Sequence, residues 1–432
     1  MKVLKKVYYR IKFTLSSPLA VGSGENENAD KDIVRDASGK PYIPASSIAG
    51  VARTALKNKN MDSYLGNVIK ADVSNQEVSA EDSMILFYDA IMEHDQKYSI
   101  SVRDCVGLDQ YKTAKEGAKF DMEVLEPGPI FVTFIEQNIT ELKRMNVAGI
   151  IADLFKSNKF CFGGKTTRGY GDVSVSEIRQ KEFDLQKPVE IEEWVSFDMY
   201  DESIEWDDYI GYGDEQKDIG TTITLTLKQK GGISIRKYST KPGKKIKMYN
   251  GDFKKIPEPD YEQLTLSGTN PIPIIPGTSW AGAFGHQMRK LGLSERDYED
   301  LFGYVKGNRT KKSLIRFSET QLENAYPKKM SRNAIDRFSG GAADGALFTE
   351  RTYYDGNTKL KISVNGRLND DQIFALSASI SDLGYGFMAV GGLTAIGRGL
   401  FSIIEVNSKP VKNEEIFQTV KRILSGQEVN AL

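Results

Sequence analysis

The chain contains an internal repeat, and this repeat constrains its fold more than any other feature. Three sequence blocks occur twice, in the same order and about 230 residues apart. Chance is a poor explanation for this agreement, so we predict two similar folded units. The blocks are "GKPYIPASSIAGVARTAL" (39–56) and "NPIPIIPGTSWAGAFGHQMRKL" (270–291), "VRDCVGLDQYKTAKEGAKFDMEV" (102–124) and "SRNAIDRFSGGAADGALFTERTY" (331–353), and "FGGKTTRGYGDVSV" (162–175) and "VGGLTAIGRGLFSI" (390–403).

Each unit begins with alternating apolar and polar residues, "VYYRIKFTL" (7–15) or "TTITLTLKQ" (221–229), which predicts a strand with one buried face. A helix, a hairpin-like insertion, a second helix and a last strand are predicted to follow. This order is typical of a ferredoxin-like fold. The predicted fold class is therefore α+β, with two tandem ferredoxin-like domains that carry long insertions. The residues predicted to cap the first helix of each unit are Ser46, Ser47, Thr278 and Ser279.

Charge is segregated along the chain, although the net charge is only −1. Acids greatly outnumber bases over residues 182–218, whereas residues 228–255 hold ten bases and one acid, Asp252. Such runs are either solvated faces or, for the basic run, a track for a polyanion. The predicted domains are 1–185 and 219–408, joined by an acidic linker (186–218) and followed by a C-terminal helical tail (409–432).

Composition excludes several classes of protein. Two cysteines, Cys105 and Cys161, are too few for a disulfide framework or a cysteine-based zinc site. No apolar run is long enough to cross a bilayer, and "MKVLKKVYYRIKF" lacks the apolar core of a signal peptide. We therefore expect a cytoplasmic protein with no membrane partner.

The stretch "GGKTT" (163–167) looks like the phosphate loop of an ATPase, but the repeat argues against this interpretation. The second copy has Leu393 where the first has Lys165, and a phosphate-loop lysine is indispensable. The motif also needs a glycine at the position of Lys159, and a helix where a strand is predicted. The shared feature is the glycine skeleton, which allows tight turns and close backbone approach.

Together these motifs resemble the RAMP superfamily and, more narrowly, the Cas7-type backbone subunits of type III CRISPR effector complexes. The most specific pieces are "RNAIDRFSGGAADGALF" (332–348) and "IVRDASGKPYIPASSIAG" (33–50). The resemblance covers both halves and implies a tandem fusion of two such subunits. It implies a palm that holds guide RNA, a thumb formed by the inserted hairpin, and crRNA, target RNA and other Cas proteins as partners.

On this resemblance, hydroxyls at the helix starts and bases near the glycine loops are predicted to contact RNA phosphates. Each hydroxyl could equally be a plain helix cap, and the two roles are compatible. The predicted RNA-binding residues are Ser46, Ser47, Arg53, Lys165 and Arg168 in the first unit, with Thr278, Ser279, Arg289 and Arg398 as their counterparts in the second.

The resemblance also implies a catalytic Asp in the loop before the first helix, with cleavage that depends on a divalent ion such as Mg²⁺. Its motif aligns with Asp30, with Asp32 as the near alternative, and Asp30 is the predicted metal ligand. In the second unit the match is Asp260, or Glu262 if no gap is allowed. A solvated polar loop without catalysis is the competing interpretation.

Other polar residues are assigned structural roles. Asp36, Asp109 and Asp336 each precede a turn and are expected to accept backbone amide hydrogen bonds. His94 and His286 are the only histidines and lie in different units, which disfavours a His-dependent ribonuclease. Two functions remain open: a guide-directed endoribonuclease, and a scaffold that binds RNA without cutting it.

Overall fold

The computed structural model describes residues 2–24, 29–57, 59–66, 81–108, 114–157, 160–211, 220–238, 244–247, 253–256, 259–266 and 271–427. It divides into two compact units. The first comprises Met1–Cys105, Phe120–Thr166 and Tyr170–Lys217, and the second comprises Val106–Lys119, Thr167–Gly169 and Asp218–Leu432.

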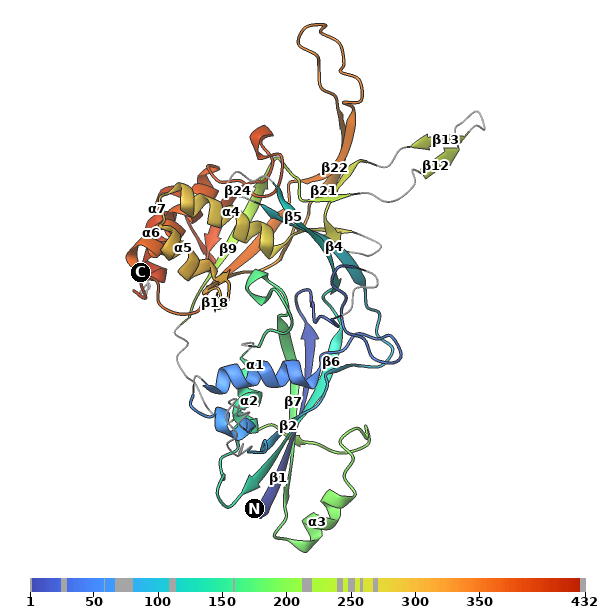
Figure 1. Cartoon of the computed structure of the whole chain (residues 1–432), viewed down its shortest axis with the longest axis vertical. Helices are drawn as coiled ribbons and strands as arrows, with labels where there is room; N and C mark the ends of the chain where they lie inside the picture. The colour runs from blue at the N-terminus through green and yellow to red at the C-terminus, as the bar shows by residue number, and fades with distance from the viewer. Residues whose placement is uncertain are drawn as a thin grey trace. The chain divides into compact units, whose positions relative to one another are not determined.

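The first unit has the ferredoxin-like strand order. Its sheet runs β2-β6-β1-β7, and every neighbouring pair is antiparallel (Figure 1). The first predicted strand forms the centre of this sheet. The elements are β1 (Val3–Leu15), α1 (Ala45–Lys57), β2 (Ile85–Phe87), β6 (Ile130–Thr140), α2 (Val147–Lys156) and β7 (Val173–Asp184).

The second unit repeats this order. Its sheet runs β19-β23-β9-β24, again with antiparallel neighbours. The predicted fold class and the predicted duplication are therefore confirmed. The elements are β9 (Thr221–Lys230), α4 (Gly277–Lys290), β19 (Ile315–Phe317), β23 (Asn357–Val364), α6 (Asp370–Tyr385) and β24 (Leu400–Val406).

In each unit the helices cover one face of the sheet, because alternate strand residues are apolar. Val7, Tyr9, Ile11 and Phe13 of β1 share a buried core with helices α1 and α2. In the second unit Ile223, Leu225 and Leu227 of β9 play the same part, beneath Trp280 and Phe284 of α4 and apolar residues of α6. The opposite face of each sheet is left for other contacts.

Each unit carries a hairpin between its second and third sheet strands, as predicted. The first hairpin consists of β4 (Ile100–Leu108) and β5 (Ala114–Leu125), and the second of β21 (Tyr326–Arg332) and β22 (Phe348–Tyr354). Both hairpins follow the second sheet strand of their repeat, but Val106–Lys119 of the first hairpin is grouped with the second compact unit. The loop between β21 and β22, orange in Figure 1, extends away from the helices and sheet of the second unit.

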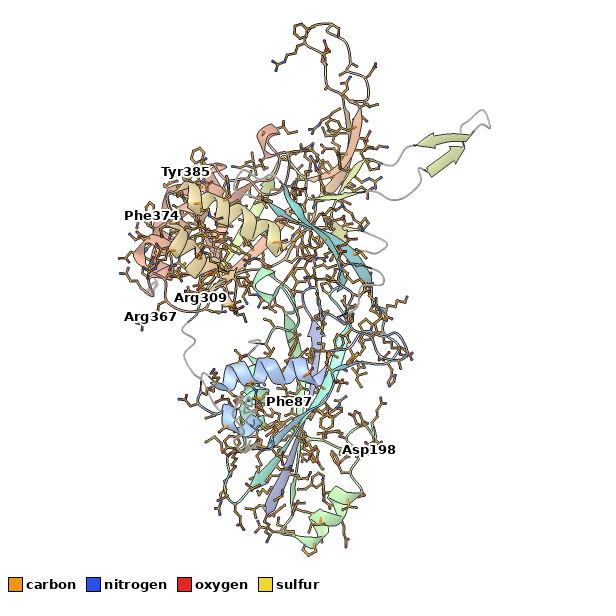
Figure 2. The ribbon with its side chains drawn as sticks, viewed as in Figure 1. Phe87, Asp198, Arg309, Arg367, Phe374 and Tyr385 are labelled. Atoms are coloured by element: carbon orange, nitrogen blue, oxygen red, sulfur yellow. The ribbon has the colours of Figure 1, made fainter. Side chains whose placement is uncertain are left out.

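The predicted acidic linker is largely folded against the first sheet. It contains α3 (Pro188–Val195) and β8 (Asp207–Asp208), which pairs with β7. The Trp194 indole donates to the Tyr8 hydroxyl at 2.9 Å, and burial raises the pKa of the Tyr8 phenol to about 12. Three further aromatic residues of this cover segment (188–208) pack on the sheet or on each other: Phe197, Tyr200 and Trp206. Asp198, labelled in Figure 2, belongs to the same segment.

The predicted C-terminal tail likewise belongs to the second unit. Helix α7 (Asn413–Leu424) places Ile416, Val420 and Leu424 in the core, and β25 (Lys409–Pro410) extends the sheet next to β24. The boundary predicted at residue 408 lies between β24 and β25. The amphipathic pattern of this helix was the signal for its burial.

The remaining described elements are short insertions and edge strands. No described helix is both long and apolar enough to cross a membrane. They are η1 (Asp62–Leu65), β3 (Ile91–Met92), η2 (Thr166–Arg168), β10 (Gly232–Ile233), β11 (Arg236–Tyr238), β12 (Lys244–Lys247), β13 (Phe253–Ile256), β14 (Tyr261–Gln263), β15 (Thr265–Leu266), β16 (Ile272–Ile275), α5 (Glu295–Phe302), β17 (Tyr304–Lys306), β18 (Arg309–Lys311), β20 (Thr320–Gln321) and η3 (Thr394–Ile396).

Candidate functional site

The two first helices begin in the same way, but not with the predicted caps. Helix α1 begins at Ala45 and α4 at Gly277, with Pro276 as the N-cap of α4 and no side-chain cap there. The four predicted cap residues thus lie inside the first turn. Ser46 and Thr278 are exposed, and within the described part of the chain none of the four hydroxyls makes a hydrogen bond.

The proline explains this difference, because its carbonyl already accepts the amides of the first turn. The Ser47 amide donates to the Pro44 carbonyl and the Ser279 amide to the Pro276 carbonyl, each at 2.9 Å. Asp89 accepts the Ala45 amide at 2.7 Å. Among the described residues, the hydroxyls at positions 46, 47, 278 and 279 therefore have no hydrogen-bond partner at the two helix starts.

The two glycine loops have the same backbone conformation. Lys165 and Leu393 both adopt a left-handed φ, 55° and 56°, and so do Gly171 and Gly399, 76° and 73°. At Gly399 an added Cβ would lie 1.9 Å from the Val390 carbonyl oxygen, so only glycine fits. When the two loops are aligned on these residues, Arg398 corresponds to Tyr170 and not, as predicted, to Arg168.

Replacing Gly399 with Ala is expected to destabilise the second unit strongly. Gly397, two residues earlier, has a similar φ of 79° but open space where its Cβ would lie. Gly397→Ala should cost about 1–2 kcal/mol for backbone conformation. Gly399→Ala should cost roughly 1–3 kcal/mol more for the clash. Thermal unfolding of both variants measures the difference, and equal losses would contradict the close approach.

Each hairpin carries a residue of a buried ion pair, and each of these pairs also involves a residue of the glycine loop. In the first unit Arg103 donates to Glu126 at 2.8 Å and to the Tyr170 hydroxyl at 3.3 Å, with Arg103 3% and Glu126 5% exposed. In the second, Arg398 pairs with Glu350, which also accepts from Arg332 at 2.7 Å.

Arg398 is therefore held in an ion pair within the protein, which argues against its predicted contact with RNA. It is 4% exposed, and its guanidinium also donates to the Tyr354 hydroxyl. A side chain in this position links the hairpin to the glycine loop. We do not include Arg398 in the RNA surface proposed below, since no phosphate can reach it without breaking a buried pair.

Two other predicted RNA-binding bases, Arg53 and Lys165, already contact groups of the protein. Arg53 donates to the carbonyls of Leu65 and Gly66, at 2.7 and 3.1 Å, which ties it to η1. The Lys165 ammonium lies 3.0 Å from the Cys105 sulfur and 4.7 Å from the centre of the Phe120 ring.

The remaining two bases are also partly engaged. Arg289 stacks 3.4 Å from the Tyr298 ring centre and pairs with Glu295 at 2.7 Å. Arg168 lies in Thr167–Gly169, which is grouped with the second unit, and donates to the Thr167 carbonyl at 3.2 Å.

Asp30 and Asp260 occupy equivalent positions in the two units. Asp30 is exposed, and its carboxylate accepts the backbone amide of Asp121 on β5 at 2.9 Å. Asp260 is exposed as well, and its carboxylate accepts the amide of Thr349 on β22 at 2.7 Å. Each carboxylate is thus attached to the second strand of its hairpin. This agreement favours Asp260 over Glu262, which pairs with Arg351 at 2.7 Å.

The other acidic candidates serve the local backbone. Asp32 is 4% exposed and accepts the Ala29 amide at 2.8 Å, so it shapes the loop that carries Asp30. Asp36 and Asp336 accept backbone amides of their own turns, as predicted. Hydrogen bonds from the Ser38 hydroxyl and then from the Lys40 amide hold the pKa of Asp36 below its usual range. Asp109 lies outside the described residues.

A divalent cation would find only part of its ligand set in this chain. The described residues contain no group of three or more His, Cys, Asp or Glu side chains able to hold a metal. One exposed carboxylate per unit does fit Mg²⁺, which is usually bound through one or two carboxylates together with substrate phosphates and water. Asp30 and Asp260 would be those carboxylates.

A shallow hollow of about 290 Å³ lies beside α4 in the second unit. Its lining includes His286 and Lys290 of α4, Phe387, and Thr394 of the glycine loop. His286 was predicted to be structural or on the surface, and it lies here at the wall. His94 is exposed in the first unit. The two histidines therefore lie in separate units, as the sequence indicated.

The loop at the end of the second hairpin is ordered around Asp336 and presents an apolar side chain. Asp336 accepts the amides of Phe338 and Ser339, and backbone hydrogen bonds join Asp336 to Gly340 and Gly341. Phe338 is fully exposed at this turn, and Ile335 is 66% exposed. Phe338 and Ile335 are thus apolar side chains that this loop presents to solvent.

The chain matches a known protein family. A protein-family model described as the RAMP superfamily matches residues 12–174 and 214–402, which is most of the chain. The first region runs from the end of β1 to the start of β7, the second from before β9 to the start of β24, and each contains one hairpin. A search of curated proteins returns no match.

Proposed function

The chain belongs to the RAMP superfamily, and on this premise we propose that it is a tandem backbone subunit of a type III CRISPR effector. In this role it binds crRNA with both units and cleaves complementary target RNA at Asp30 and Asp260. Membership of the RAMP superfamily indicates a CRISPR-associated subunit. The guide, the cleavage and the Cas partners are the proposal.

One observation carries the proposal. Two carboxylates, Asp30 and Asp260, are exposed in equivalent loops and are both bonded to the second strand of a hairpin insertion. A solvated polar loop has no need to repeat this geometry in both units. Two sites in one chain would cut a target at two positions, with a spacing set by the repeat of the protein.

The free hydroxyls at the helix starts support guide binding. Ser46, Ser47, Thr278 and Ser279 offer four donors without partners of their own among the described residues. Hydroxyls of this kind bind phosphate oxygens without reading base identity. A guide backbone could therefore follow the two equivalent helix starts whatever its sequence.

At each cleavage site the carboxylate would orient the target strand. Asp30 or Asp260 would hold the attacking 2′-hydroxyl near the scissile phosphate, and the backbone hydrogen bond fixes the carboxylate for this task. A bound Mg²⁺ or other divalent ion would supply neutralisation of phosphate charge. Phe338 would act as the apolar tip of the second thumb against the bases of the guide–target duplex.

Removing the hydroxyls of one helix start is expected to weaken guide retention. Each lost hydroxyl–phosphate hydrogen bond costs about 1 kcal/mol, so Thr278→Val with Ser279→Ala should bind guide roughly 30-fold more weakly. Thr54→Val is the matched control, because the Thr54 hydroxyl donates to the Gly50 carbonyl within α1. Guide RNA bound per assembled effector is measured by filter binding, and equal retention by all variants would contradict this RNA surface.

The alternative is a scaffold of the same complex that binds RNA without cutting it. Both functions need the RNA surface, so guide retention does not separate them. They differ in whether substituting Asp30 or Asp260 changes target cleavage. A complex that binds guide and target but gives no Asp-dependent product would be the scaffold.

A further inference from the structure

The open faces of the two sheets, opposite their helices, have contrasting electrostatics. In the first unit the bases on this face are neutralised: Lys6 pairs with Glu136 at 2.5 Å, Arg10 with Glu177 at 3.0 Å, and Lys12 with Glu93 at 2.5 Å. The aromatic cover segment lies over part of the same face. Part of this face is therefore covered by the chain itself, and the three bases have carboxylate partners.

The same face of the second sheet carries unpaired lysines. Lys228 and Lys230 lie on β9, and Lys359 and Lys361 lie on the neighbouring strand β23. All four are exposed, and within the described part of the chain their ammonium groups make no ion pair or hydrogen bond. Their neighbours on this lysine face are Thr222, Thr224, Thr226, Arg316, Asn357, Ser363 and Ser402, and the exposed Glu323 is bridged to Asn357 at its edge.

The acidic and apolar groups on the lysine face are few. Glu405 pairs across from Thr226 and accepts its hydroxyl at 2.8 Å. Ile404 is 44% exposed beside it, and none of the described side chains on this face is aromatic. The face therefore lacks the apolar centre of a protein interface and the aromatic platform that stacks bases.

We propose that this lysine face binds the phosphate backbone of a single-stranded RNA segment. Ammonium groups and hydroxyls side by side on adjacent strands match a chain of phosphates, and binding through phosphates needs no aromatic or apolar surface. The inference goes beyond the guide surface, because α4 and its Thr278 lie on the opposite side of the same sheet. The segment bound here is therefore not the one held at the helix starts.

The test measures binding of a fluorescein-labelled 20-nucleotide oligo(U) to the full chain across a series of salt concentrations. Lys359→Gln with Lys361→Gln removes two phosphate contacts. The slope of log K against log salt should fall by about 1.4, and binding at 0.1 M salt should weaken about 20-fold. Lys359→Arg with Lys361→Arg should restore both. Lys412→Gln with Lys421→Gln removes the same charge at the ends of α7 and should leave the slope unchanged.

The proposal is overturned if the glutamine pair matches wild type in slope and affinity, or if wild type itself fails to bind oligo(U) at low salt. It is also overturned if the glutamine pair binds oligo(U) normally but no longer enters the assembled effector, since the face would then dock an acidic protein. The four side chains are exposed, so unchanged thermal unfolding of each variant verifies that the fold is intact. Combining the pair with Thr278→Val and Ser279→Ala should give additive losses if the two surfaces are separate.

Discussion

Replacing Arg103 with Met is expected to destabilise the first unit by about 3–5 kcal/mol, because Glu126 would remain as a buried charge without its cationic partner. The Glu126 carboxylate is 5% exposed, and its other bond is from the Ser101 hydroxyl. Trp194 and Trp206 belong to the first unit and Trp280 to the second. Urea unfolding followed by tryptophan fluorescence, together with limited proteolysis, therefore shows which unit has lost stability.

Two further variants separate the buried charge from simple loss of packing. Arg398→Met should cost less than Arg103→Met, since Glu350 keeps Arg332 at 2.7 Å. Arg103→Met combined with Glu126→Leu should recover much of the stability, because both charges are then gone. If Arg103→Met alone is neutral, or if the double variant is worse than the single one, the ion pair is not what stabilises this hairpin.

Asp30→Asn is expected to slow cleavage at one target position by about 10²–10⁴-fold, the usual effect of removing a positioned acid–base group. Asparagine keeps an oxygen that accepts the Asp121 amide, so the loop is expected to stay in place while the charge is lost. Asp260→Asn should do the same at a second position through Thr349. Rates are measured in assembled complexes with equal guide content.

Asp36→Asn is the matched control for this series. Asp36 is an exposed carboxylate of the same stretch, and its side chain accepts the amides of Ser38 and Lys40 at 2.9 Å. Its substitution should leave both cleavages intact. Equal losses for Asp36→Asn and Asp30→Asn would mean that general negative charge matters here, and not a positioned carboxylate.

The repeat allowed most of the fold to be predicted from sequence. Strand alternation located β1 and β9, and the shared blocks located the first helices, the hairpins and the glycine loops. The cover segment was missed because its acids dominated the composition, although Trp194, Phe197 and Trp206 carried the contrary signal. Aromatic side chains in an acidic run need a surface to pack on, and the open face of the first sheet provides it.

The site was harder to predict, because sequence does not show which charges are buried together. Arg398 looked like a free base beside a glycine loop, but it is buried in an ion pair with Glu350. The helix starts were predicted two or three residues too late, since Pro44 and Pro276 already accept the amides of the first turns. The sequence left Asp260 and Glu262 as alternatives to match Asp30, because the flanking sequences differ, and the hydrogen bonds to the hairpins favour Asp260.

The most direct test of the central claim is the product pattern of target RNA cut by the effector assembled with crRNA and Mg²⁺. We expect wild type to give two Asp-dependent cuts, Asp30→Asn and Asp260→Asn each to lose a different one, and the double variant to bind target without cutting it. If all four complexes give the same products, or if wild type binds target and gives none, then Asp30 and Asp260 are not cleavage sites and the chain is a scaffold.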